Sequence, residues 1–478
     1  MASPLLLTDG YKFSMAEAGW PLRKETFYYS HRKGGLQVLP FDVEAELRKL
    51  LPVSEPGDWE YLAKNDYEMG SAVRAALESR ELVVRALPKG AVFSDREPVF
   101  SVTGPSALVS WLEPTALMWS YRIQVATLAL LRPEELSAAV GTVTCEAQRE
   151  LVLETLDAVG VKAPALEVKS DEYVARVRAR VAELVGIVGS PSRIFEVGLR
   201  AASCPQQHLL ALEGAKQAGL TRTSNVWGAR KLGLVPVGTM GHEHIQRYGS
   251  DEAAFRAMVE RRWQRSSFLL DTFDTITSGI PTAYRIICER PGQQDSIRYD
   301  SGDKEAQYRF AAAEARRLGI RPVQILEDGF DAKQTRRFEE LRAELGWRPE
   351  EQVYGYGGYL VAQTSGSPLT RDRVSAVYKL TQTGAKPTMK FGNESGSGKQ
   401  SIPGRPVLFR RSAGGSGPFG IVGQEGEAVP QGYHLLTGAA AAGTTALDEA
   451  RAVSEADRRM EPSPATRALI AELSHWKT

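Results

Sequence analysis

The chain has 478 residues, of which 42% are hydrophobic and 24% are charged, a composition that is ordinary for a globular protein and sufficient for two or three domains. Its formal net charge of +1 gives no overall attraction for nucleic acid or an anionic membrane, so a bound anion must be held by local groups. No apolar run approaches the ~20 residues of a spanning helix and no signal peptide is recognisable, so we expect a cytoplasmic protein with neither a membrane nor a nucleic-acid partner.

The cysteines Cys145, Cys204 and Cys288 stand far apart and form no Cys-x-x-Cys pair. Such spacing argues against a structural zinc site. We expect these thiols to be reduced and buried.

Residues 1–130 show a mixed α/β pattern. The aromatic-rich run 25–30 is typical of a strand, two more strands are predicted within 82–105, and the run 107–131 is long, apolar and helical. Charged helical patterns then dominate residues 131–190, where the arginines that follow an N-cap signature at 170–172 are interpreted as a solvated helix face.

An alternation of strand and helix begins near residue 191 and continues to about 380. Short apolar runs are predicted as strands at 194–197, 234–237, 268–270, 296–299, 323–326 and 352–354. From residue 234 onward these runs start roughly 30 residues apart, which is the length of one βα unit. The spacing predicts a β/α barrel.

Polar or glycine-rich residues follow each predicted strand directly, at 198–200, 238–243, 271–274, 300–303, 327–329 and 355–358. The carboxyl ends of barrel strands meet at one rim, where barrel active sites are built. The sequence therefore predicts a single pocket at this rim. The stretch 223–246 supplies the richest set of polar groups to it, because a buried strand there leads into Gly-Thr-Met-Gly-His-Glu (238–243).

Backbone and cationic groups near the late strands suit phosphate. Gly329, Gly357 and Gly358 follow strands after which barrels often place phosphate on backbone N–H donors, and Arg371 and Lys379 come shortly afterwards with positive charge. Taken alone, each glycine turn is more simply explained as a tight loop.

Carboxylates at the same rim suit a cation or a sugar. Four carboxylates are hard oxygen ligands for Mg²⁺, or acceptors for ribose hydroxyls: Asp271, Asp300, Asp303 and Asp328. Asp-Ser-Gly-Asp alone is an ordinary turn. A lone histidine after a strand, such as His242, is also more often structural than catalytic. Only the joint occurrence of these turns predicts an activated sugar phosphate or a nucleotide as the ligand.

Taken together, these motifs resemble a known family, the nicotinate phosphoribosyltransferases, which are close relatives of the nicotinamide phosphoribosyltransferases. The matching motifs occur in the family's order and approximate spacing: TDGYK (8–12), EVGLR (196–200), TSNV (223–226), GTMGHE (238–243), LLDTFDT (269–275), RYDSGD (298–303), EDGFD (327–331), YGYGGY (354–359), VYKL (377–380) and IPGR (402–405). GTMGHE and RYDSGD are the more specific of them.

The resemblance implies an α/β protein with the type II phosphoribosyltransferase fold, in which an irregular, incomplete β/α barrel is joined to an α/β sandwich domain formed by both chain ends. Residues 1–130 would begin the sandwich, 131–190 would form a helical insertion, 191–380 the barrel, and 381–478 would return to the sandwich. A homodimer with shared active sites is also implied.

The implied reaction joins nicotinate to 5-phosphoribosyl 1-diphosphate and yields nicotinate mononucleotide and diphosphate for NAD biosynthesis, with Mg²⁺ as cofactor and ATP as co-substrate. ATP would phosphorylate His242, Asp271 would orient its imidazole, and Asp300 would contact ribose hydroxyls or Mg²⁺. Positioning and electrostatics would drive the glycosyl transfer without a nucleophilic side chain.

The resemblance also assigns the base site. Tyr11 would stack on the pyridine ring from the neighbouring subunit, Arg200 would lie beside base and phosphate, and Arg298 would contact the carboxyl group of nicotinate. Ser224 would favour nicotinate, because nicotinamide-using relatives carry an acidic residue there that would repel a carboxylate.

Alternatives remain open because Val197 stands where the family usually has an aromatic residue that stacks on the pyridine. They are a nicotinamide phosphoribosyltransferase and a non-catalytic nucleotide-binding homologue. The quinolinate enzyme is less expected, since it is shorter and lacks the histidine phosphorylation.

The last hundred or so residues are rich in Gly, Ser and Ala and are predicted as loops between short strands, followed by a helix over 463–476. Lys390 and Lys399 are interpreted as solvated loop lysines, with contact to phosphate as the alternative, and His244 as structural.

Overall fold

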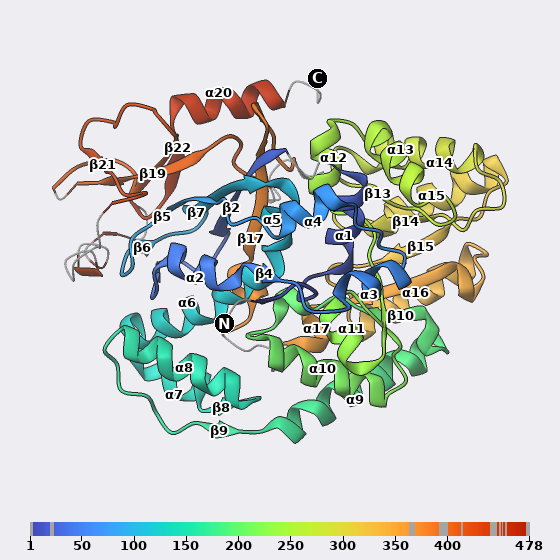
Figure 1. The fold of residues 1–478 in the computed structure, drawn as a ribbon, viewed down its shortest axis with the longest axis horizontal. Helices are drawn as coiled ribbons and strands as arrows, with labels where there is room; N and C mark the ends of the chain where they lie inside the picture. The colour runs from blue at the N-terminus through green and yellow to red at the C-terminus, as the bar shows by residue number, and fades with distance from the viewer. Residues whose placement is uncertain are drawn as a thin grey trace.

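The structure is a computed structural model that describes residues 3–19, 23–362, 369–391, 400–412, 414–439, 447, 448, 451, 453, 454 and 457–474. The barrel segment forms a seven-stranded sheet in the order β12-β11-β10-β16-β15-β14-β13 (Figure 1). Its strands are β10 (Ile194–Glu196), β11 (Arg222–Thr223), β12 (Val235–Pro236), β13 (Ser267–Leu269), β14 (Ser296–Tyr299), β15 (Val323–Leu326) and β16 (Gln352–Tyr356).

Each neighbouring pair in this sheet is parallel. β12 and β13 stand at the two ends of the order, so the curled sheet stays open between them in the described part of the chain. The predicted incomplete barrel is therefore confirmed, and each predicted run contains a strand. β11 escaped prediction because only two of its residues pair, too few to give a hydrophobic run.

Helices connect the strands: α10 (Pro205–Gln217), α11 (Val226–Leu232), α12 (His242–Tyr248), α13 (Asp251–Arg261), α14 (Ile280–Cys288), α15 (Lys304–Leu318), α16 (Ala332–Glu344) and α17 (Gly358–Val361). Their starts are set by the sequence, because the side chains of Asn225, Ser250, Asp303 and Asp331 each accept the backbone N–H three residues later. The polar residues at the carboxyl rim thus serve partly as helix caps.

A five-stranded antiparallel sheet, β18-β17-β2-β7-β5, is built from segments before and after the barrel. β2 (Lys24–His31) and β7 (Pro98–Pro105) come from the first part of the chain, and β17 (Ala376–Thr383) pairs with β2 after the barrel is complete. β5 (Val83–Ala86) and β18 (Lys386–Pro387) are the edges. Segments on both sides of the barrel therefore share one sheet, and β17 joins it before residue 381, where the return to the sandwich was predicted to begin.

The C-terminal residues add a four-stranded sheet of β19 (Pro406–Arg411), β20 (Gly420–Gln424), β21 (Tyr433–Leu435) and β22 (Met460–Pro462), and the helix α20 (Pro464–Leu473). Ser463 caps α20 by accepting the N–H of Thr466, which confirms the predicted helix as far as the described residues reach. Smaller elements of the first part are β1 (Ser3–Pro4) with β4 (Pro52–Val53), β3 (Gln37–Val38) with β6 (Val92–Phe93), and helices α2 (Val43–Leu50), α3 (Asp58–Lys64) and α4 (Ser71–Leu77).

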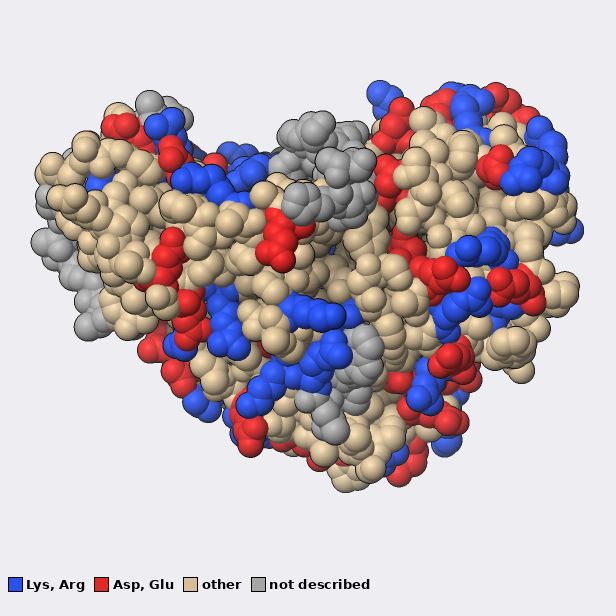
Figure 2. Space-filling view, turned by 90° about the horizontal axis from the view of Figure 1, so that it is seen from above, with Lys and Arg blue, Asp and Glu red and all other residues tan. Residues whose placement is uncertain are grey.

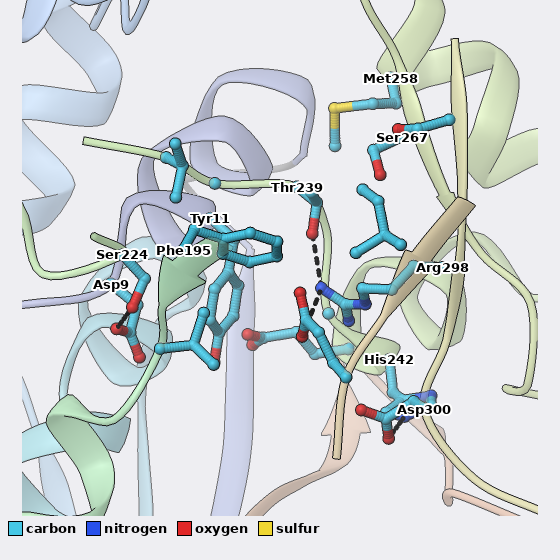
Figure 3. A pocket seen from close by; sticks show the side chains of 18 of the residues that line it. Asp9, Tyr11, Phe195, Ser224, Thr239, His242, Met258, Ser267, Arg298 and Asp300 are labelled. Carbon is cyan, nitrogen blue, oxygen red and sulfur yellow. Dashed lines mark hydrogen bonds and ion pairs between the residues drawn. The ribbon is translucent and has the colours of Figure 1, made fainter. Parts of the chain in front are cut away.

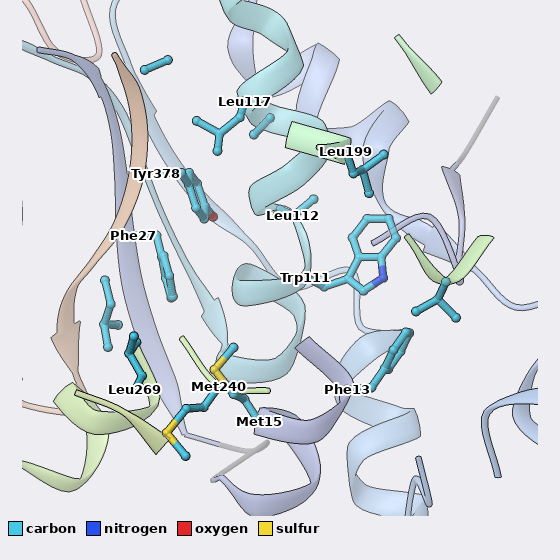
Figure 4. Packing of buried hydrophobic residues seen from close by; sticks show 14 of the residues in the cluster. Phe13, Met15, Phe27, Trp111, Leu112, Leu117, Leu199, Met240, Leu269 and Tyr378 are labelled. Atoms are coloured by element: carbon cyan, nitrogen blue, oxygen red, sulfur yellow. The ribbon is translucent and has the colours of Figure 1, made fainter. Parts of the chain in front are cut away.

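The core joins sandwich and barrel around three helices, α1 (Gly10–Ala18), α5 (Ser106–Trp111) and α6 (Glu113–Leu131). α6 is buried along almost its whole length, which explains its apolar character on every side. Figure 4 shows Phe13 and Met15 of α1 packed among Trp111, Phe27 and Met240. The N-terminal helix is thereby fixed between the two domains, next to the barrel rim.

The segment 131–190 contains α7 (Pro133–Val140), α8 (Glu146–Ala158), the short pair β8 (Thr142–Val143) and β9 (Glu167–Val168), and α9 (Ser170–Val188). α7 and α8 pack with the end of α6 in a core cluster of their own. α9 instead packs on the barrel helices α10 and α16 through a stripe that includes Val177, Val181 and Leu184. The helix therefore has a buried apolar side in addition to the solvated arginine side that the sequence predicted.

Charges of both signs are mixed over the face drawn in Figure 2, with a group of Lys and Arg near its middle. This mixture agrees with the net charge of +1. In the described ranges, no helix combines the length and the apolar character needed to cross a membrane.

Candidate active site

A cavity of about 1370 Å³ lies at the barrel rim (Figure 3). Its lining includes Asp300 and Glu327 after β14 and β15, Tyr11 of α1, and Lys379 of β17. The cavity continues along the strands as far as Ser267 at the start of β13. One large space is therefore bounded by the barrel, the N-terminal helix and the sandwich, as the convergence of the polar turns predicted.

His242 is the first residue of α12 and lies among two carboxylates, a hydroxyl and an ammonium. Nε2 is 3.2 Å from Oδ2 of Asp300 and 3.8 Å from Oδ1 of Asp271, and Nδ1 is 3.0 Å from Oγ1 of Thr272. Nζ of Lys390 is 2.7 Å from Nε2. The predicted grouping of His242 with Asp271 and Asp300 is thus present, and Lys390 completes it.

These contacts select one form of the imidazole. Burial, and then the charge of Lys390, lower the pKa of His242 below its ordinary value, which favours the neutral ring. Because an ammonium can only donate, Nε2 accepts from Lys390 and the ring proton is on Nδ1, which donates to Thr272. The nitrogen that faces Asp300 therefore carries a lone pair.

The solvated position predicted for Lys390 is wrong. The residue is 5% exposed, and Nζ lies 3.7 Å from Oδ2 of Asp271 and 3.6 Å from Oδ2 of Asp300. A buried ammonium needs compensating charge, which these two carboxylates supply. Burial alone would raise the pKa of Asp300, but His242 and Lys390 hold it well below its usual range. Lys399 lies outside the described residues.

The possible metal ligands include Asp271 and Asp300 of the predicted carboxylates, but not Asp303 or Asp328. Among the described residues, one group of His, Cys, Asp and Glu has ligand atoms close enough together for a metal, and it consists of His242, Asp271 and Asp300. Asp303 is excluded because its carboxylate is exposed and accepts the N–H of Ala306 as the cap of α15. Asp328 lines the cavity in a left-handed conformation (φ 58°) but is not part of the group.

Two aromatic rings face the middle of the cavity, Tyr11 of α1 and Phe195 of β10 (Figure 3). Phe195 was not predicted, although it shares a strand face with Val197, the position where an aromatic was expected. Its ring fits because residue 355 is glycine: a Cβ there would lie 2.9 Å from the ring of Phe195. An aromatic side chain is therefore available two residues before Val197.

Tyr11 lines the cavity of its own chain, whereas the prediction placed it in the site of the neighbouring subunit, and that sharing stays a prediction. The N–H of Gly10 donates to the carbonyl of Ser224, and a Cβ on Gly238 would lie 2.2 Å from the backbone nitrogen of Tyr11. The start of α1 is thus packed directly against the ends of β11 and β12. Its hydroxyl donates to Oε2 of Glu113 at 2.8 Å, which fixes the ring.

Arg298 of β14 lies on the opposite side of the cavity from Asp9 and Ser224 (Figure 3). Nη1 donates to Oγ1 of Thr239 at 2.5 Å, whereas Nε is buried and makes no hydrogen bond among the described residues. The nearest carboxylate, Oε2 of Glu327, is 3.9 Å away, and burial raises the pKa of Glu327. Arg298 therefore keeps donor capacity and positive charge for a ligand.

Ser224 does not present a free hydroxyl, because its Oγ donates to Oδ1 of Asp9 at 2.6 Å. Burial raises the pKa of Asp9. Both residues line the cavity. Residue 224 is neutral, as the sequence indicated, but the carboxyl group of Asp9 lies directly beside it.

A series of buried ion pairs links the N-terminal helix and the sandwich to the barrel. Glu25 pairs with Arg247 at 2.9 Å, Arg247 with Glu243 at 3.1 Å, and Lys12 lies 2.5 Å from both Glu243 and Glu113. Burial alone would raise the pKa of Glu113, but the charge of Lys12 holds it well below its ordinary value. These pairs tie α1, α6 and β2 of the sandwich to α12 of the barrel. Sequence reasoning missed Glu113, since a single acid in an apolar helix carries no motif.

Cations gather at the rim, as predicted. Arg200, Arg371 and Lys379 all line the cavity, and Nζ of Lys379 is 3.9 Å from Oε1 of Glu113. Burial lowers the pKa of Lys379 to about 7. The glycines Gly329, Gly357 and Gly358 lie in the turns next to this region but are not in the cavity lining, so their phosphate role stays a prediction.

His244 is fully buried and donates from Nε2 to the carbonyl of Ala254 at 2.9 Å. Burial lowers its pKa to about 4. The predicted structural role of this histidine is confirmed.

No family model matches the chain, but it is similar to several proteins named nicotinate phosphoribosyltransferase. The chain is similar to a nicotinate phosphoribosyltransferase of Mycobacterium tuberculosis, with 31% identity over 251 residues that make up 51% of this chain and 50% of that protein. It is also similar to the nicotinate phosphoribosyltransferase of Bos taurus, with 24% identity over 449 residues, 85% of this chain and 76% of that protein. The chain spans about half the length of the bacterial relatives it matches, for example 53% of the Bacillus subtilis enzyme.

Solved structures with the same fold include the nicotinate phosphoribosyltransferase from Porphyromonas gingivalis, with a TM-score of 0.61 and 19% identity, covering 84% of this chain and 96% of that chain. The enzyme of the same name from Vibrio cholerae gives a TM-score of 0.59 and 17% identity, covering 83% and 90%. At these identities the similarity establishes the fold.

Proposed function

Because the chain belongs to the nicotinate phosphoribosyltransferase family, we propose that it joins nicotinate to 5-phosphoribosyl 1-diphosphate. The products are nicotinate mononucleotide and diphosphate, for use in NAD biosynthesis. ATP is the co-substrate and acts through His242. The protein works in the cytoplasm as a homodimer.

The observation that carries the proposal is the position of Arg298. Its guanidinium is buried, has an Nε donor with no partner among the described residues, and lies across the cavity from the rings of Tyr11 and Phe195. A pyridine ring between two aromatic side chains, with its carboxylate on an arginine, satisfies all of these groups at once. Nicotinate has this combination of a flat ring and a carboxylate.

The phosphate groups occupy the cationic part of the rim. Arg200, Arg371 and Lys379 offer positive charge from three separate elements, so several phosphate oxygens can be neutralised together. As diphosphate leaves, the ribose C1 becomes oxocarbenium-like and the pyridine nitrogen attacks it. Charge placement and orientation lower the barrier, and no nucleophilic side chain is required.

His242 receives the γ-phosphoryl group of ATP on Nε2. The lone pair on this nitrogen, the hydrogen bond from Nδ1 to Thr272 and the adjacent ammonium of Lys390 support this role. The bond from Nε2 to phosphorus forms as the bond to ADP breaks, and Lys390 balances the incoming negative charge. A phosphohistidine at the rim then changes the affinity for diphosphate and favours its release.

Mg²⁺ fits the carboxylates of this cluster. Oδ1 of Asp271 is buried and accepts no hydrogen bond among the described residues, and Oδ2 of Asp300 faces the same space. Mg²⁺ prefers oxygen ligands and commonly binds one or two carboxylates together with substrate phosphates. Asp300, with Asp271 beside it, would hold the ion, which supplies charge neutralisation for the leaving diphosphate.

The direct test is mononucleotide formation by the purified protein with 5-phosphoribosyl 1-diphosphate and Mg²⁺, with and without ATP. We expect nicotinate mononucleotide, faster in the presence of ATP, and transfer of label from γ-labelled ATP to the protein. His242→Ala should abolish the labelling and the ATP effect. Absence of both mononucleotide and label in the wild-type protein would instead favour the non-catalytic nucleotide-binding homologue.

A nicotinamide phosphoribosyltransferase is the second candidate, and one contact favours it. The carboxyl group of Asp9 lies 2.6 Å from Oγ of Ser224, where it could accept a hydrogen bond from a carboxamide. Burial raises the pKa of Asp9, so this carboxyl group is protonated more easily. The protonated form would repel the carboxylate of nicotinate less, so the contact does not exclude nicotinate. Replacing nicotinate by nicotinamide in the same assay separates the two candidates.

A further inference from the structure

Two cysteines face each other where α8 meets α10. Sγ of Cys145 lies 3.7 Å from Sγ of Cys204, although 59 positions separate them in sequence, and both residues are buried. Each is the N-cap of a 13-residue helix, with φ −160° and −159° and ψ 164° in both. The expectation that the cysteines are buried is correct for Cys145 and Cys204, whereas Cys288 is exposed.

The two cysteines belong to a repeated local motif, Thr-Cys-x-x-Gln at 144–148 and Ser-Cys-x-x-Gln at 203–207. In the first, Oε1 of Gln148 accepts from the backbone and the hydroxyl of Thr144, both at 2.7 Å. In the second, Oε1 of Gln207 accepts from the backbone and the hydroxyl of Ser203, at 2.7 and 3.0 Å. Each glutamine thus fixes the backbone just before a thiol, so both sulfurs are held toward each other.

The surroundings separate the two thiols chemically. A hydrogen bond with Cys204 lowers the pKa of Cys145 to about 7, and the same bond with burial raises the pKa of Cys204 well above its ordinary value. Helix N-termini also favour a thiolate. Either sulfur could donate in the contact between them, but Cys145 is the more exposed thiol, at 8% against 3% for Cys204, so we take Cys145 as the nucleophilic sulfur.

A metal does not explain the pair. Among the residues that the structure describes, the metal-compatible group is the one at His242, and neither cysteine belongs to it. A tetrahedral zinc site needs further nitrogen, sulfur or oxygen ligands, which are not gathered around these sulfurs.

We propose that Cys145 and Cys204 are a redox modification site that closes to a disulfide in the presence of a two-electron oxidant such as hydrogen peroxide. The Cys145 thiolate attacks the peroxide, giving a sulfenic acid and water after proton transfer. The sulfur of Cys204 then attacks Sγ of Cys145, the S–S bond forms, and a second water leaves. Two thiols and one peroxide yield one disulfide and two waters. The sulfurs must approach from 3.7 Å to about 2.05 Å.

The bond would connect the helical insertion to the active site. Cys204 follows the short helix η2 (Leu199–Ala201), whose Arg200 lines the cavity, and it starts α10. Closing the disulfide would pull Cys204 toward α8 and would therefore displace the C-terminal end of the segment 199–204, which carries Arg200. Misplacement of a binding group by about 1 Å can cost up to 100-fold in rate, so we expect the KM for 5-phosphoribosyl 1-diphosphate to rise roughly 10-fold in the oxidised protein. This second effect rests on the proposed function.

The experiment treats the full chain with peroxide and maps its peptides without reduction, before and after dithiothreitol. We expect a cross-linked pair of peptides containing Cys145 and Cys204, lost on reduction. Cys288→Ser is the matched control and should form the same cross-link, whereas Cys145→Ser should not form it. Kinetics are measured on the same samples, where oxidised Cys145→Ser should keep the KM of its reduced form.

The outcomes separate the two claims. If both thiols remain free under conditions that fully oxidise the exposed Cys288, the modification site is wrong. If the cross-link forms and the KM does not change, the link to Arg200 is wrong. If the reduced protein makes no mononucleotide, the proposed function fails, while the peptide map still decides whether the disulfide forms.

Discussion

Nζ of Lys390 lies 2.7 Å from Nε2 of His242, and this contact joins positions 148 residues apart. It brings a cation from the segment after the sandwich strand β17 to the nitrogen that would carry a phosphoryl group. The same ammonium lies within 4 Å of Asp271 and Asp300, at 3.7 and 3.6 Å. The charge of this lysine therefore offsets only one of the two carboxylates before any phosphate binds.

Replacing Lys390 by Met should raise the pKa of His242, because a nearby positive charge is removed while burial remains. In the proposed reaction the neutral imidazole would accept the phosphoryl group, so the acidic limb of the pH profile for labelling by γ-labelled ATP should shift to higher pH. Loss of one charge-stabilising donor should also slow labelling by about 100-fold. Lys386→Met, at an exposed position of β18, is the control. An unchanged acidic limb would contradict the role of Lys390.

Replacing Arg298 by Gln should weaken nicotinate binding. A hydrogen bond to a charged group contributes about 1.5 to 3 kcal/mol, so we expect the KM for nicotinate to rise roughly 10- to 100-fold. The KM for 5-phosphoribosyl 1-diphosphate should change little, since Arg298 lies by the base. Arg309→Gln, on an exposed face of α15, controls for loss of charge. Equal changes in both KM values would show that Arg298 does not read the carboxylate.

Lys379 should make phosphoribosyl diphosphate binding depend on pH. Its pKa is lowered to about 7 by burial, so it is charged below pH 7 and loses its charge as the pH rises through this value. A bound diphosphate favours the charged form, so binding at pH 8 should take up a proton. Calorimetry in buffers of different ionisation enthalpy measures this uptake. Lys379→Arg stays charged and should show none, and equal proton uptake by both proteins would refute the assignment.

Phe195 should contribute more to base binding than Val197. Stacking of a base on an aromatic side chain contributes about 1 to 3 kcal/mol, so Phe195→Leu should raise the KM for nicotinate roughly 10-fold. Val197→Leu keeps an aliphatic side chain at the position where the resemblance led us to expect an aromatic residue, and should have a small effect. A larger increase in the KM for nicotinate with Val197→Leu than with Phe195→Leu would indicate that residue 197, and not Phe195, contacts the base.

Replacing Glu113 by Gln should destabilise the fold. Lys12 would keep one carboxylate partner, Glu243, and the hydroxyl of Tyr11 would lose a charged acceptor. Breaking a buried ion pair by removing one partner costs about 3 to 5 kcal/mol. Urea unfolding should show a lower midpoint than wild type, while Glu305→Gln, which removes an exposed carboxylate of α15, should leave the midpoint almost unchanged. A midpoint equal to that of wild type would mean that water replaces the lost contact.

The sequence predicted the barrel well because its strands are apolar, evenly spaced and followed by polar turns. His242, Asp271 and Asp300 were found because they stand in polar turns at strand ends, and the family resemblance gave them their roles. Arg298 lies inside β14 and was assigned by the resemblance alone. β11 was missed because two paired residues leave no periodic signal.

Residues brought to the site from outside the barrel were harder to predict. Lys390 was predicted as a loop lysine because no residue near it in the sequence indicates its contacts with Asp271 and Asp300. Glu113 stands alone in an apolar helix, and its partners Lys12 and Tyr11 come from about a hundred residues earlier. The place of Tyr11 at the cavity of its own chain depends on how α1 packs against β11 and β12, which is a tertiary property.

The base preference tests the central claim most directly. It is measured as the ratio of kcat/KM for nicotinate to that for nicotinamide in the wild-type protein with ATP present. Because Nε of Arg298 is a buried donor with no partner among the described residues and can donate to a carboxylate, we expect a ratio of about 100 in favour of nicotinate. A ratio at or below one would contradict the assignment of nicotinate and point to the carboxamide contact at Asp9.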